Sequence, residues 1–102
     1  MIGFLYITPN DNFDCLELNG PAAHAVFDAI KEPMSKQLGA EWFKRAEFEF
    51  EVLEEINLTE LSADDFNLVC SLILNAAKDN TWIAAFEPEL QKQLKIDPRY
   101  KN

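Results

Sequence analysis

The stretch Ile56–Asp79, INLTELSADDFNLVCSLILNAAKD, decides the fold of this chain. Ser62 precedes an apolar run, and a hydroxyl there can accept a hydrogen bond from a free backbone N–H at a helix start. Asp64 and Asp65 follow in the first turn, where the helix dipole favours negative charge. Two apolar stripes at helical spacing come next: Phe66, Val69, Cys70, Ile73 and Ala77, and then Leu68, Leu72 and Ala76. A helix that is apolar nearly all round must be covered on most sides, so we predict that it is the central core helix.

The N-terminal residues have the pattern of a β-hairpin. Ile2–Thr8 is β-branched and aromatic on both faces, which predicts a strand that is not a solvent-exposed edge. Residues 9–12 are Pro, Asn, Asp and Asn, which are common in turns. The side chains of residues 13–18 alternate in a pattern that predicts a second strand. The acidic and amide residues of 10–14 lack the spacing, the central Gly and the bidentate Glu of a calcium-binding EF-hand, so we expect a turn.

An amphipathic helix is predicted over residues 21–32. Asn19 and Gly20 precede Pro21, which costs no hydrogen bond at the first helical position. We expect Pro33 to end or kink this helix and Gly39 to close the segment. His24 lies one position off the apolar face, which indicates a surface or boundary residue.

Residues 40–56, AEWFKRAEFEFEVLEEI, fit two patterns. We predict a short helix over 40–45 and a strand over 47–54, because glutamates alternate with apolar residues from position 47 to 52. As a strand, this segment would project Glu47, Glu49 and Glu51 from one face about 7 Å apart, at ~3.4 Å rise per residue. A strand face that is merely exposed to solvent, with no partner, would have the same sequence pattern. The helical alternative leaves Phe48 and Val52 on the solvent side.

The C-terminal part predicts a final helix. Residues 79–81 form a break and a new cap, and the apolar positions from Trp82 to Leu94 follow at helical spacing, with a bend at Pro88 and a terminal turn over 95–100. The whole chain, 1–102, is predicted to be one α+β domain. A small antiparallel sheet, made of the N-terminal hairpin and the strand near 47–54, would pack with three or four helices. The alternative is a mainly helical fold with one hairpin.

The composition of the chain argues against several classes of location, binding site and activity. The apolar run Met1–Ile7 is short and lacks flanking basic residues and a cleavage site, so we expect neither a secretory signal nor a membrane span. Cys15 and Cys70 have no CxxC spacing and His24 is the only histidine, so we expect no metal site, no cofactor and two buried thiols in a reducing cytoplasm. Nucleophilic catalysis needs a Ser or Cys beside a base, and a chain of this length rarely builds a cleft for paired carboxylates. We therefore predict no catalytic residues and no enzymatic activity.

Charge is the strongest functional signal in the sequence. The net charge is −9, and residues 46–77 contain eight acidic residues and no Lys or Arg. Such a block argues against binding nucleic acid or an anionic membrane, and it is compatible with a basic protein partner. The predicted partner-binding residues are Glu47, Glu49, Glu51, Glu54, Glu55, Glu60, Asp64 and Asp65.

Two segments resemble bacterial immunity proteins of contact-dependent growth inhibition systems. They are the helix entrance 61–67, LSADDFN, and the segment 82–100, which closes with Asp97-Pro98-Arg99-Tyr100. The resemblance implies a monomeric cytoplasmic protein that binds the C-terminal toxin domain of a sibling cell, frequently a nuclease, in a 1:1 complex. It carries over no named active residues. The alternative is a non-enzymatic acidic adaptor or nucleic-acid mimic that inhibits another basic protein.

Overall fold

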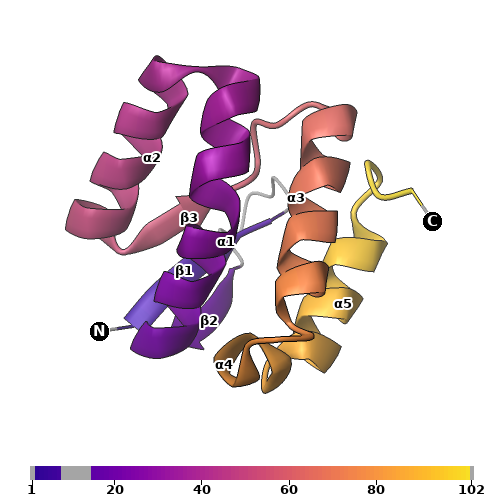
Figure 1. Ribbon diagram of the computed structural model, residues 1–102. Coiled ribbons are helices and arrows are strands. Elements are labelled where there is room, and N and C mark those ends of the chain that lie inside the picture. Colours follow the sequence, from indigo (N-terminus) through magenta and orange to yellow (C-terminus); the bar gives the residue numbers. More distant parts are fainter. Residues whose placement is uncertain (1, 8–14, 102) are drawn as a thin grey trace.

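Three short strands form one mixed sheet in a computed structural model that describes residues 2–7 and 15–101 (Figure 1). The strand order is β2-β1-β3, with β1 at Ile2–Tyr6, β2 at Leu16–Asn19 and β3 at Glu55–Asn57. β1 pairs antiparallel with β2 and parallel with β3. The α+β class and the middle position of the first strand are confirmed, but the sheet is not wholly antiparallel. The predicted turn at 9–12, and the prediction that residues 10–14 form no calcium-binding loop, fall on residues outside the described part of the chain.

The inner face of the sheet packs against helix α1 (Gly20–Leu38). Leu5, Leu18 and Ile56 are buried on that face. Leu5 lies opposite Ile56 on β3, and Leu18 on β2 lies opposite Gly3. The approach is closest at Gly3, where an added Cβ would overlap the Cβ of Ala23 on α1. Only glycine therefore lets the helix lie this close to the sheet.

Helix α1 is longer than predicted. The Asn19 side chain caps its start by accepting a hydrogen bond from the Ala22 N–H at 2.9 Å. The helix continues past Pro33 to Leu38, so the prediction that it spans 21–32 is wrong at its C-terminal end. The extra turn buries Met34 completely, which offsets the hydrogen bond that Pro33 cannot donate. Gly39, at φ 98°, closes the helix as expected.

The predicted strand over 47–54 is wrong, because helix α2 runs unbroken over Ala40–Leu53. The helix places Phe50 against α1, where its ring stacks on that of Phe27 at 4.5 Å between centroids. Glu54 then takes a left-handed conformation, φ 58°, and the chain enters β3. The third strand is thus real but lies at 55–57. Burying Phe50 outweighs the glutamate alternation, which is a surface pattern with no packing behind it.

Helix α3 (Ala63–Ala76) confirms the predicted core helix and its cap. The Asp65 N–H donates to the Ser62 hydroxyl at 3.2 Å, and the predicted stripe from Phe66 to Ala77 is buried. The second stripe, Leu68, Leu72 and Ala76, is only partly buried. The prediction that this helix is the central one is wrong. The central position belongs to α1, which packs against β1, β2, α2, α3 and the short helix α4 (Thr81–Ala84), with α2 and α3 on either side of it (Figure 1).

The predicted final helix is two helices. α4 begins at the Asn80 cap, whose side chain accepts from the Trp82 and Ile83 N–H groups. α5 (Glu87–Ile96) starts anew before Pro88, which lies in its first turn. The predicted cap is confirmed, and the expected bend is a full break. The described residues thus form five helices rather than three or four. In the described part of the chain, no helix is long and apolar enough to cross a membrane.

Candidate partner-binding surface

The structure divides the eight predicted acidic residues among several places. Glu47 and Glu51 are one turn apart on α2, and Glu49 lies on a different side of that helix. The predicted row of Glu47, Glu49 and Glu51 on one face therefore does not exist, because residues two positions apart share a face in a strand but not in a helix. Glu54 forms the C-cap of α2, and Asp64 is exposed in the first turn of α3. The remaining three, Glu55, Glu60 and Asp65, line a pocket together with Glu49.

Helix α2 exposes large apolar side chains on the side away from α1. Phe48 is 56% exposed and Val52 is 61% exposed, and the two are one helical turn apart. Glu47 and Glu51 form the neighbouring row. We call Glu47, Phe48, Glu51 and Val52 the α2 outer face. In Figure 1, α2 forms one side of the molecule, beyond α1.

A pocket lies between α2, β3 and the loop that leads to α3. It has a volume of about 280 Å³, and its wall includes Trp42 and several apolar side chains: Phe27, Ile30, Leu38, Ala46, Ile56, Leu58 and Leu61. We call it the α2–β3 pocket. Trp42 is half-buried here. The other tryptophan, Trp82, is 52% exposed on α4.

The pocket wall carries more negative than positive charge. Among the described residues that line it, Arg45 is the only basic one, beside four acidic residues. The Arg45 guanidinium contacts the Glu49 carboxylate at 3.7 Å and the Glu60 carboxylate at 3.8 Å. Burial raises the pKa of Glu49, Arg45 opposes that shift, and Glu55 and Glu60 add to it. The net effect is a rise, so Arg45 does not compensate Glu49 fully.

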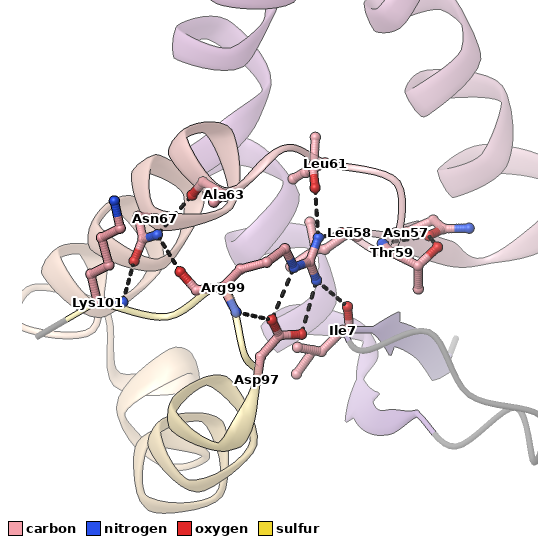
Figure 2. Close-up of polar contacts among 10 residues, drawn as sticks. All are labelled: Ile7, Asn57, Leu58, Thr59, Leu61, Ala63, Asn67, Asp97, Arg99 and Lys101. Carbon is pink, nitrogen blue, oxygen red and sulfur yellow. Dashed lines mark hydrogen bonds and ion pairs between the residues drawn. The ribbon is translucent and has the colours of Figure 1, made fainter.

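The loop on the other side of the pocket is held by Arg99, as Figure 2 shows. The Arg99 Nη1 donates to the carbonyls of Leu58 at 2.9 Å and Leu61 at 2.8 Å, and its Nη2 donates to the Ile7 carbonyl at 2.8 Å. The remaining donors bind the Asp97 carboxylate at 2.9 and 3.0 Å. All five guanidinium N–H groups are therefore used.

Further contacts tie the C-terminal residues to α3. The Arg99 guanidinium lies 4.0 Å over the Phe66 ring. The Asn67 carboxamide donates to the carbonyl of Arg99 and accepts from the Lys101 N–H. The C-terminal segment thus fixes the 58–62 loop that lines the α2–β3 pocket. The sequence predicted only a terminal turn here.

The cysteines and the histidine lie apart from this surface. Both thiols are reduced, but Cys15 is exposed, so the prediction of two buried thiols is wrong for that residue. Burial, together with the Asp97 charge, raises the pKa of Cys70 to about 12. His24 is exposed as predicted, and its ring meets the Phe50 ring edge-on at 5.0 Å. Within residues 2–7 and 15–101, no group of three or more His, Cys, Asp or Glu side chains could hold a metal ion.

Two features of this surface are not predicted from the sequence: the exposed apolar pair on α2 and the long-range contacts of the arginines. In the helical alternative for residues 40–56, Phe48 and Val52 point to solvent, which argued against a helix. In the structure the segment is a helix, and these two side chains form an exposed apolar pair. The sequence does not predict the long-range contacts of Arg45 and Arg99. Arg45 reaches Glu60, and Arg99 reaches backbone carbonyls of two segments that are distant in the chain. Comparison with protein-family models, with curated proteins and with solved structures finds no match for this chain.

Proposed function

We propose that this protein is a cytoplasmic immunity-type inhibitor, which binds the C-terminal toxin domain of a contact-dependent growth inhibition system. The partner in this proposal is a basic domain, such as a nuclease, and it is neutralised by occlusion in a 1:1 complex. The proposal is supported by the resemblance of residues 61–67 and 82–100 to such immunity proteins, and by the surface of α2.

The observation that carries the proposal is the α2 outer face. Phe48 and Val52 are more than half exposed, side by side, on a helix whose other side is packed. Large apolar side chains grouped on a surface are typical of a protein-binding site, especially where polar residues rim them. Glu47 and Glu51 supply such a rim. Desolvation of the apolar pair would slow dissociation, since a few buried anchors provide most of the energy of an interface.

The charge of the protein supports a basic protein as the partner. The protein has a net charge of −9, and eight of its acidic residues lie in 46–77, a segment that includes the second half of α2 and part of the pocket wall. Opposite charges on two proteins raise their association rate, towards ~10⁸–10⁹ M⁻¹ s⁻¹ at low salt. A nuclease holds phosphates with Lys and Arg. Carboxylates placed against those cations would exclude the substrate.

The test is binding to the purified C-terminal domain of the protein encoded by the adjacent upstream reading frame. We expect the Phe48→Ala/Val52→Ala variant to raise the Kd at least tenfold, mainly through faster dissociation. The Glu47→Lys/Glu51→Lys variant should slow association and weaken its dependence on salt. Both variants should keep the unfolding midpoint of the wild type, because the changed side chains are on the surface.

A matched control separates local contact from overall charge. Asp79→Lys/Glu89→Lys makes the same change in net charge at two exposed positions, one just after α3 and one on α5, away from α2 (Figure 1). Equal slowing by both charge variants would contradict a specific interface on α2. Failure of the upstream product to bind, with a different basic protein bound through the α2 outer face, would favour the adaptor or nucleic-acid-mimic alternative.

A further inference from the structure

We infer that the α2–β3 pocket receives an arginine side chain of the partner, and that Arg45 holds this place in the free protein. The inference rests on the proposed function for the identity of the partner, a basic protein domain. The chemistry of the pocket itself comes from its own residues and can be tested without that partner.

The size and walls of the pocket suit one long side chain. Its volume of about 280 Å³ lies below the ~300–1,000 Å³ that is usual for sites of small-molecule ligands. Trp42 and the apolar side chains of α1 and α2 would cover the aliphatic part of an arginine, as long charged side chains bury their stems against apolar surface. Glu49 and Glu60 would meet its guanidinium. They come from opposite sides of the pocket, α2 and the 58–62 loop.

Arg45 shows that these carboxylates accept a guanidinium, and that the present arrangement is weak. Its contacts with Glu49 and Glu60, at 3.7 and 3.8 Å, are too long for hydrogen bonds, and its side chain is 60% exposed. Arg99 is the contrast within the same molecule, since all five of its donors are bonded at 2.8–3.0 Å. An arginine of the partner that enters the pocket from the solvent side could displace Arg45 at little cost in free energy, because exposed ion pairs contribute little to stability.

The position of the pocket fits the same partner. Arg45 lies two turns before Val52 on nearly the same row of α2, so the pocket adjoins the α2 outer face. The opposite wall is held in place by Arg99, which bonds the carbonyls of Leu58 and Leu61. A partner seated on Phe48 and Val52 would therefore bring its basic side chains to a pocket that is already formed.

The test uses Nα-acetyl-arginine amide as the probe and its neutral analogue Nα-acetyl-citrulline amide as the control, with binding followed by NMR. We expect saturable shifts at the Trp42 indole with the arginine probe and none with the citrulline probe. Arg45→Gln should tighten binding roughly two- to fivefold, the range that loss of one exposed competing ion pair allows. Glu49→Gln should weaken binding at least fivefold. Lys44→Gln makes the same charge change on the other side of α2, and should leave the Kd within twofold of the wild type.

Equal effects of Arg45→Gln and Lys44→Gln on binding would overturn the inference, and so would shifts that map to residues outside the pocket. Equal binding of the citrulline probe would also overturn it, because the site would then be a neutral polar slot. These outcomes are separate from the proposed function. If the probe binds in the pocket and the upstream product does not bind, the proposed function fails and the arginine pocket stands. If the upstream product binds and the probe does not, the reverse holds.

Discussion

Arg99 is expected to be the most costly single charge to remove from this protein. Its guanidinium bonds three backbone carbonyls from two distant segments and both oxygens of Asp97, whose side chain is 1% exposed. Arg99→Ala would leave these carbonyls without their donor and remove the charged partner of a buried carboxylate. Breaking a buried ion pair from one side costs about 3–5 kcal/mol. The free energy of unfolding of a domain is only ~5–15 kcal/mol, so the loss would be a large fraction.

The assay is urea unfolding at neutral pH, with the free energy extrapolated to water. Arg99→Lys should lose most of the same stability, because an ammonium cannot replace a planar group with five donors. Arg45→Ala is the matched control. That arginine is 60% exposed and its contacts are long, so its removal should cost about 0–1 kcal/mol. If Arg99→Ala unfolds within 1 kcal/mol of the wild type, the Arg99 network does not hold the C-terminal segment and the 58–62 loop as described.

Three further predictions follow from single positions. Gly3→Ala should lower the thermal unfolding midpoint by several degrees, because its methyl group overlaps Ala23, and an unchanged midpoint would mean that α1 can shift away from β1. A thiol reagent should label one cysteine in the folded protein, the exposed Cys15, and label Cys70 only after denaturation; two labelled thiols in the native state would contradict the burial of α3. Because burial raises the pKa of Glu49 in the folded state, the stability linked to its proton is full below its ordinary value of 4.5 and is lost as the pH rises through the raised pKa. Glu49→Gln should therefore be more stable than the wild type at pH 7, with the difference closing in melts below pH 4.5, and a less stable variant at pH 7 would show that the ion pair with Arg45 outweighs burial.

The sequence predicts those parts of the fold that rest on local chemistry. Asn19, Ser62 and Asn80 cap helices where their side chains indicated, and Gly39 closes α1. The buried stripe of α3 follows helical spacing residue by residue. These features depend on residues within about four positions of each other, so the local sequence is enough to predict them.

The errors arise where tertiary packing decides. The 47–54 segment has strand alternation, and packing of Phe50 on Phe27 selects a helix instead. Pro33 should end a helix, and burial of Met34 carries it onward. The same limit applies to the candidate site. The sequence identified the acidic segment, but which carboxylates share a pocket depends on how α2 faces the 58–62 loop, a contact between elements that no local pattern encodes.

The most direct test of the proposed function is survival of cells that produce the toxin domain together with variants of this protein. Wild type should protect the cells, and Phe48→Ala/Val52→Ala should lose protection while accumulating to the same level as a folded protein. Ile96→Ala, which removes an even more exposed apolar side chain from α5, should protect like the wild type. Full protection by the Phe48→Ala/Val52→Ala variant would contradict the assignment of the α2 outer face as the toxin-binding surface.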